Sequence, residues 1–121
     1  MARHGTVWVV DIIAGAGEFA EPDTTGATYV EQFRRPDMSV GTYSLHAGAV
    51  DPQRPHTEDE VYAVVSGHGR FTSGGQTVDV RAGSVFFVPA GEAHRFHDIR
   101  EGLAVLVVFG PAYGTRTASD R

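Results

Sequence analysis

The sequence predicts an all-β, antiparallel domain with little or no helix. Three observations lead to this fold class. Runs rich in valine, isoleucine, phenylalanine and tyrosine, which favour strands, recur along the chain. Glycine and proline turn signals separate these runs at short, regular intervals. No segment longer than a turn is predicted to be helical. Short strands separated by regular turns are typical of an antiparallel sandwich or barrel. With 121 residues, the chain is expected to form one domain, residues 1–121.

The first part of the chain contains three expected strands. Residues 6–13 are rich in Val, Ile and Trp, and this composition favours a strand. Residues 14–27 are small, polar and rich in glycine, which predicts a long loop. Loops of that length are often functional, so this one could act as a lid. Two further strands are expected at residues 27–33 and 38–46, joined by a turn at residues 34–37.

The rest of the chain contains six shorter expected strands, at residues 61–65, 70–73, 76–80, 84–88, 94–99 and 103–109. Glycine-containing stretches at residues 66–69 and 100–102 are expected to end the strands before them. The pair Gly74-Gly75 is a signal for a two-residue hairpin. Residues 111–121 are polar and small, which predicts a frayed, disordered tail.

Two of the expected strands are apolar on both faces. Residues 6–13 carry one charged residue, Asp11, and residues 103–109 carry none. A strand that is apolar on both sides is usually covered on both sides. In so small a domain the second cover can come from another subunit, and we therefore expect a homodimer.

Composition excludes several classes of partner and chemistry. The net charge of −5 argues against binding to nucleic acid, which requires basic patches. Without cysteine the chain has no disulfide, thiolate nucleophile or Cys-ligated metal. No apolar run is long enough to span a membrane, and Asp11 interrupts the run near the N-terminus, which argues against a signal peptide. We expect a cytoplasmic protein.

Three side chains in two stretches indicate a metal site. His56 and Glu60 lie four residues apart and lead into the apolar run at residues 61–65. His94 follows a Pro-x-Gly turn that closes the run at residues 84–88. Two histidines and one carboxylate, with coordination positions left open, suit non-haem Fe(II) and related divalent metals. Glu60 opens directly into the strand, so we expect its neighbours Glu58 and Asp59 to be the exposed acids.

The same two stretches resemble the paired motifs of the cupin superfamily. The first motif is carried by Gly48, Arg54, His56, Glu60 and Gly67. The second is carried by Gly83, Pro89, Gly91, His94 and Asp98. The resemblance covers residues 40–110 and implies a double-sheet jelly-roll barrel in a small, single-domain cupin. The chain departs from the family pattern at Arg54, where a metal-binding histidine is usual, and at Asp98, where asparagine is usual.

Alternation along a strand predicts which side chains face the interior of such a barrel. It selects Arg54, His56, Glu60, Tyr62 and Val64 in the first motif, and His94, Phe96 and Asp98 in the second. A largely apolar cup with a few convergent polar groups is the usual form of a small-molecule site. We expect Tyr62 to contact substrate and to serve proton transfer with histidine, and Phe96 to contact substrate.

The direction of Arg54 is left open by the sequence. Facing inward, its guanidinium would compete with a metal for Glu60 or would bind an anion. However, Pro52 and Pro55 flank it, and proline disturbs regular strand pairing. If the alternation slips there, Gln53 points inward instead and supplies a fourth, weaker oxygen ligand.

Three functions are consistent with these residues, and the least favoured is a structural protein whose His and Glu are relics, because three ligand types stand at motif spacing. The first is a metal-dependent enzyme that acts on a small, oxygen-rich organic molecule, because the cupins that this chain resembles include dioxygenases, isomerases, decarboxylases and polyketide cyclases. The metal would be Fe, Mn, Ni or Zn. The second is a binding module without turnover that holds a small molecule, for example an anion through Arg54.

Overall fold

The computed structural model describes residues 3–4, 7–8 and 10–116, and places none of these in a helix. Eight strands are formed: β1 (Arg3–His4), β2 (Val7–Trp8), β3 (Ala27–Arg35), β4 (Met38–Leu45), β5 (Asp59–Ser73), β6 (Gln76–Arg81), β7 (Val85–Val88) and β8 (His94–Gly110). The predicted all-β class is therefore confirmed. No helix in these residues is long and apolar enough to cross a membrane.

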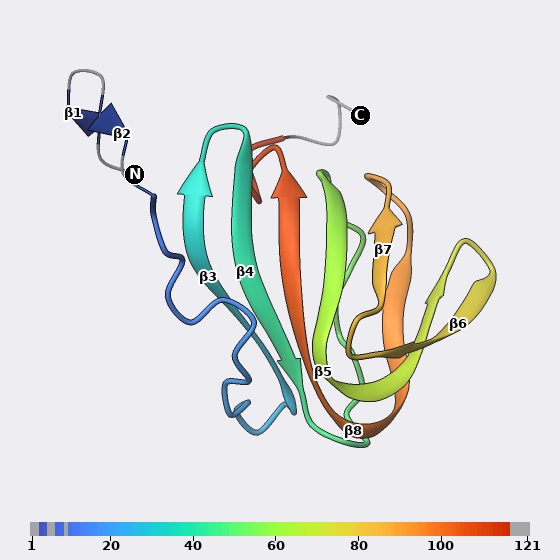
Figure 1. Ribbon diagram of the computed structural model, residues 1–121. Coiled ribbons are helices and arrows are strands. Elements are labelled where there is room, and N and C mark those ends of the chain that lie inside the picture. Colours follow the sequence, from blue (N-terminus) through green and yellow to red (C-terminus); the bar gives the residue numbers. More distant parts are fainter. Residues whose placement is uncertain (1–2, 5–6, 9, 117–121) are drawn as a thin grey trace.

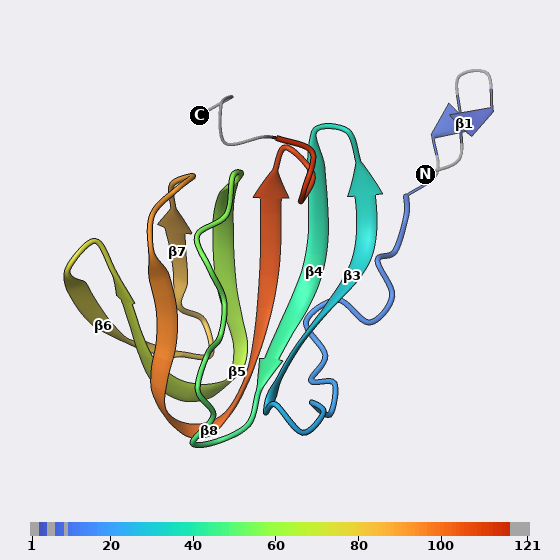
Figure 2. The ribbon, with the colours of Figure 1, turned by 180° about the vertical axis from the view of Figure 1, so that it is seen from behind.

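Six antiparallel strands form the main sheet in the order β3-β4-β8-β5-β6, and β7 pairs with β5 beside this path. Strands β5 and β8 are the longest, and both curve round the lower end of the molecule (Figures 1 and 2). Their curvature produces two layers, as in a jelly roll. The order has two ends, at β3 and β6, so the described strands make an open, curled sheet and not the closed barrel expected from the sequence.

Strands β5 and β8 run through the positions at which the sequence predicted turns. The pairing of β5 with β8 shifts register between Val64 and Ser66 and twice more before Arg70, as β-bulges do. Gly67 lies in this region with φ 94°, a conformation that favours glycine. A Cβ on Gly67 would collide with the backbone of Gly102. The stretches 66–69 and 100–102 are thus bends where two strands cross closely.

The predicted hairpin between β5 and β6 is confirmed. Gly74 and Gly75 have φ of 58° and 77°, and Ser73 pairs with Gln76 across them. Two consecutive residues with positive φ are what the tight turn between twisted strands requires.

The N-terminal part of the chain differs from expectation. The strand predicted at residues 6–13 is present in part, because Val7–Trp8 pairs with β1 in a small separate sheet. Residues 10–13 are not in a strand, and Thr6 and Val9 lie outside the described residues. The loop predicted at residues 14–27 is present up to residue 26. It is bonded to the outer side of β4, because Gly17 N and Ala20 N donate to the hydroxyls of Thr42 and Ser44. Since that side faces away from the core, the lid interpretation is wrong.

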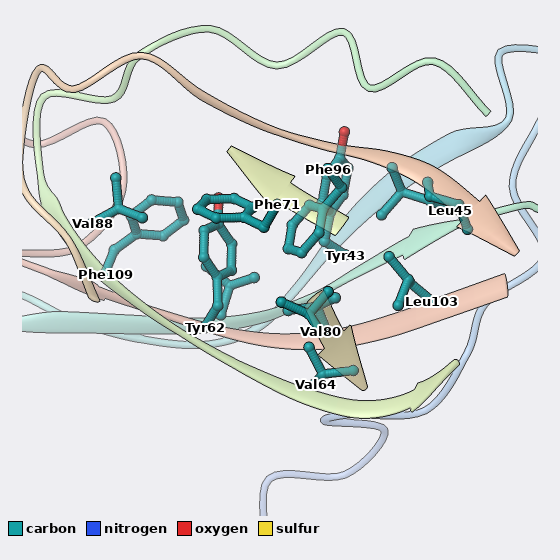
Figure 3. Close-up of a cluster of buried hydrophobic side chains, with 13 residues drawn as sticks. Tyr43, Leu45, Tyr62, Val64, Phe71, Val80, Val88, Phe96, Leu103 and Phe109 are labelled. Carbon is teal, nitrogen blue, oxygen red and sulfur yellow. The ribbon is translucent and has the colours of Figure 1, made fainter. Parts of the chain in front are cut away.

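The core lies between the two layers and is rich in aromatic rings (Figure 3). Its largest buried members include Tyr62 and Phe96, which are 1% and 0% exposed. Their ring centroids lie 5.2 Å apart in an edge-on arrangement, and Phe71 contacts both. Such edge-to-face packing is favourable beyond the area that it buries.

Residues 111–116, which the sequence assigned to a frayed tail, instead pack against the sheet. Ala112 is fully buried, Tyr113 N donates to Ser39 Oγ, and the Arg34 guanidinium donates to the Tyr113 carbonyl. Residues 117–121 lie outside the described part of the chain. The C-terminal segment thereby brings Tyr113 to the same end of the molecule as the start of β5.

Candidate metal centre

The curvature of β5 and β8 brings the two sequence motifs face to face. Glu60 lies near the start of β5 and pairs with Phe109 at the end of β8. His94 begins β8 and pairs with Ser73 at the far end of β5. Because both strands bend, Glu60 and His94 belong to opposite layers and their side chains meet between them. His56 comes from the segment between β4 and β5, which closes this end of the cup.

The three side chains proposed as metal ligands converge on one point. One ligand atom each from His56, Glu60 and His94 lies within 4.8 Å of the others. Nε2 of His94 is 3.0 Å from Oε1 of Glu60, and Nε2 of His56 is 3.9 Å from the same oxygen. Glu60 is 2% exposed and His94 is 6% exposed. This spacing is suited to one small cation shared by all three groups.

Gln53, and not Arg54, points into this cluster. Its Oε1 lies 3.2 Å from Nε2 of His56, 3.1 Å from Nε2 of His94 and 3.0 Å from the hydroxyl of Tyr62. The side chain of Arg54 is exposed, and no residue in the described part of the chain bonds to its guanidinium. The alternation therefore slips between the two prolines, which is the second of the two orientations left open by the sequence.

The chemistry of the convergent atoms fits a divalent cation. Nδ1 of His94 donates to the carbonyl of Glu92 at 2.8 Å, so in the neutral ring Nε2 carries a lone pair. That lone pair faces a carboxylate oxygen of Glu60 and the amide oxygen of Gln53, and all three atoms are acceptors. The second oxygen, Oε2 of Glu60, is buried without a hydrogen-bond partner. Acceptors facing one another need a proton or a metal between them, and ligating histidines are usually oriented by just such a carbonyl.

Burial and charge shift the pKa values of the site in different directions. Burial lowers the pKa of His56, and the nearby Glu60 only partly opposes this effect. Burial also acts to lower the pKa of His94, but its hydrogen bonds to Glu60 and to the Glu92 carbonyl outweigh it and leave the pKa raised. Burial, reinforced by Glu60, raises the pKa of Tyr62 well above its ordinary value. Tyr62 therefore keeps its phenolic proton at neutral pH.

Asp51 is a central member of the cluster that sequence reasoning missed. Its Oδ1 accepts from the hydroxyl of Tyr43 at 2.6 Å and from the backbone N of Gln53 at 3.1 Å. Its Oδ2 accepts from Nε2 of Gln53 at 2.6 Å and from the backbone N of Phe96 at 2.9 Å. An aspartate that bonds to the backbone two residues later is a common local turn and was a readable signal. The contacts with β4 and β8 were not readable.

A cavity of about 340 Å³ opens beside the metal cluster. It is lined by Gln53, His56 and Tyr62 on the metal side, and by the prolines, Arg54 and aromatic rings elsewhere; the complete lining is Tyr29, Tyr43, Pro52, Gln53, Arg54, Pro55, His56, Tyr62, Val107, Phe109 and Tyr113. Ring centroids of Tyr113 and His56 lie 5.5 Å apart, so the C-terminal segment forms one wall. Mostly apolar walls with polar groups at one end are typical of small-molecule sites.

Three further expectations about individual residues need correction. Phe96, expected to contact substrate, is fully buried in the core and does not line the cavity. Glu58, expected to be exposed, is 1% exposed, and its Oε2 accepts from Thr57 and from Arg116 N. Asp98, which strand alternation places inward with His94, has φ 47° and contacts His97 on the outer side.

The comparisons with known proteins agree with this architecture. The family model described as "Cupin domain" matches residues 41–110. An uncharacterized protein of Streptomyces coelicolor is 52% identical over 92 residues, covering 76% of this chain and 88% of that protein. Acireductone dioxygenase of Geobacillus thermodenitrificans is 40% identical over an alignment of 65 residues, and the match covers 47% of this chain and 36% of that enzyme.

A solved structure provides an independent comparison of the fold. The KdgF protein of Halomonas sp. superimposes with a TM-score of 0.70 at 19% identity, covering 85% of this chain and 94% of that one. At that level of identity the likeness concerns the fold alone. The family match, in contrast, spans both motifs and most of the main sheet. This chain belongs to the cupin family.

Proposed function

We propose that this protein is a divalent-metal-dependent enzyme that acts on a small, oxygen-rich organic molecule, by dioxygenase, isomerase or cyclase chemistry. The observation that carries the proposal is the convergence of acceptor atoms from His56, Glu60, His94 and Gln53 at one end of an apolar cavity. The similarity to acireductone dioxygenase supports it, although it spans about half of this chain.

The roles of the individual residues follow from their positions. His56, Glu60, His94 and Gln53 would hold Fe, Mn, Ni or Zn, and such an ion supplies Lewis acidity and, if it is iron, a means of activating O₂. Tyr62 retains its proton at neutral pH, so it would not act as a base. Its hydroxyl donates to Oε1 of Gln53 at 3.0 Å, and it would turn from that oxygen to donate a hydrogen bond or a proton to a substrate oxygen. The rings of Phe109 and Tyr113 would exclude water from the cavity beside the metal.

Metal content tests this proposal most simply. Protein purified without added metal should contain close to one equivalent of a divalent metal by elemental analysis. The variants His56→Ala and His94→Ala should both lose it. His46→Ala is a matched control, because His46 is held by Glu21 on the surface and belongs to no metal cluster in the described residues. Metal that persists in both site variants would contradict the proposal.

Turnover is the second requirement. Oxygen uptake and product formation would be followed with small catechols, enediols and 2-oxo acids as probes, using metal-loaded protein. The Tyr62→Phe variant should keep its metal and lose turnover, because it lacks only the phenolic hydroxyl and retains the ring and all the proposed metal ligands. A metal-loaded protein that turns over none of these classes would favour the alternative below.

The alternative is a non-catalytic module that binds a small anion. Arg54 favours it, because this exposed cation lines the cavity and no residue in the described ranges pairs with it. Benzoate binding measured by calorimetry on metal-free protein would support this function if Arg54→Ala abolished it. Arginine is suited to gripping carboxylates through two parallel hydrogen bonds.

A homodimer stays part of the proposal. Neighbouring strands β5 and β7 expose Val65, Val85 and Phe87, which are 49%, 67% and 60% exposed. Exposed apolar side chains grouped in this way often mark an interface. Light scattering at micromolar concentration should give twice the mass of 13.0 kDa, and Phe87→Ser should weaken the dimer. A wild-type monomer would contradict this expectation. The cytoplasmic compartment remains a prediction from the sequence.

A further inference from the structure

The amide of Gln53 has two chemically different ends, and only one of them can serve a cation. The oxygen is an acceptor, whereas the NH₂ group is a double donor that would repel a metal. In the structure the oxygen faces His56 and His94, and the NH₂ group faces Oδ2 of Asp51 at 2.6 Å. Gln53 therefore contributes to a cation site only while this orientation is maintained.

Asp51 dictates that orientation. A carboxylate oxygen 2.6 Å from the amide accepts hydrogen bonds, so the NH₂ end must be turned toward it. Turning the amide over would bring its oxygen against the carboxylate and its NH₂ group into the metal cluster. A single buried acceptor thus selects between an amide that attracts a cation and one that repels it.

Asp51 is itself fixed by the surrounding structure. It is 8% exposed, and both of its oxygens accept from two donors each: the Tyr43 hydroxyl and Gln53 N on one side, and Gln53 Nε2 and Phe96 N on the other. These donors belong to β4, to the segment before β5 and to β8. The carboxylate therefore ties the segment that carries Gln53 and His56 to both layers of the fold.

We propose that Asp51 is a positioning residue that makes the Gln53 carbonyl oxygen the fourth metal donor, in place of the histidine that Arg54 replaces. This inference rests on the proposed metal-dependent function. Asp51 contacts neither metal nor substrate and acts through the amide of Gln53. Groups that orient metal ligands typically change metal affinity by about 10–100-fold when mutated.

A swap of the two polar groups tests the proposal. In Asp51→Asn one accepting oxygen becomes an NH₂ donor, so this side chain no longer fixes the Gln53 amide in one orientation, and Ni²⁺ affinity measured by calorimetry on metal-stripped protein should fall by at least about tenfold. Gln53→Glu places two carboxylates against each other and should lower the unfolding temperature in EDTA. The double variant Asp51→Asn/Gln53→Glu restores a donor facing an acceptor, and should recover both Ni²⁺ affinity and unfolding temperature relative to the single variants.

Asp37→Asn is the matched control, since it removes the same charge from an exposed turn between β3 and β4. Ni²⁺ affinity in Asp51→Asn equal to that in Asp37→Asn would overturn the proposal. A double variant whose Ni²⁺ affinity or unfolding temperature is no higher than that of the worse single variant would also overturn it. If Asp51→Asn does not fold, the comparison of Gln53→Glu with the double variant decides alone. If wild type binds no Ni²⁺, Fe²⁺, Mn²⁺ or Zn²⁺, the proposed function fails, and the unfolding temperatures in EDTA still decide whether Asp51 orients Gln53.

Discussion

Replacing Gly41 by alanine should reshape the cavity wall at a measurable cost in stability. Gly41 lies on β4, and an added Cβ would collide with the hydroxyl and ring of Tyr29, which lines the cavity. The ring cannot move without entering the cavity or its neighbours, because it also contacts Phe109 and Tyr113. Forcing additional atoms into a packed region costs about 1–3 kcal/mol.

The magnitude is best measured against a second glycine of the same sheet. Gly110 ends β8, and the nearest atom to an added Cβ is the Asp37 carbonyl oxygen at 3.8 Å, an ordinary contact. Alanine in a strand is favoured over glycine by about 0.5–1 kcal/mol, and both variants share this gain. The free energy of unfolding in urea should therefore be about 1–3 kcal/mol lower for Gly41→Ala than for Gly110→Ala. Equal stabilities would refute the placement of Tyr29 over Gly41.

Three other predictions concern the bend, the metal cluster and the core. Gly67→Ala should lose more free energy of unfolding in urea than Gly83→Ala. Both glycines have φ near 95°, but only a Cβ at residue 67 would meet the backbone of Gly102. Equal losses would contradict the close crossing of β5 and β8 at this point. Protons compete with metal for His94, whose pKa is raised. Metal affinity measured by calorimetry should therefore fall as the pH drops through that raised pKa, by about tenfold per pH unit for one displaced proton. An affinity that does not change with pH would exclude His94 as a ligand. Phe96→Ala should cost about 3–5 kcal/mol of unfolding free energy without a selective loss of ligand binding, and a variant as stable as wild type would place Phe96 outside the core.

Local sequence signals predicted most of the strands but misjudged their ends. The Gly74-Gly75 hairpin was predictable because two positive φ values have a specific residue requirement. The stretch 66–69 looks like a turn for the same reason, since it contains Gly67 and Gly69. In the fold these glycines instead permit a close crossing with β8, which depends on residues 28 to 36 positions away. Local composition cannot distinguish a chain reversal from a bulged bend.

The candidate site was predictable where the motif spacing is regular and not where proline interrupts it. His56, Glu60 and His94 lie together as their spacing indicated. The choice between Gln53 and Arg54 depended on a slip in alternation between two prolines, and no pattern in the sequence gives its extent. Asp51 and Tyr113 reach the site through long-range contacts, and the polar composition of residues 111–116 concealed their packing.

The most direct measurement of the central claim is an X-ray experiment that locates the metal. Crystals of metal-loaded protein, measured on both sides of the absorption edge of the added ion, should show one anomalous peak in bonding contact with Nε2 of His56, Nε2 of His94 and an oxygen of Glu60. The amide oxygen of Gln53 should face the same peak. A peak at another place, or a fully loaded protein whose ion contacts fewer than two of these side chains, would contradict the account.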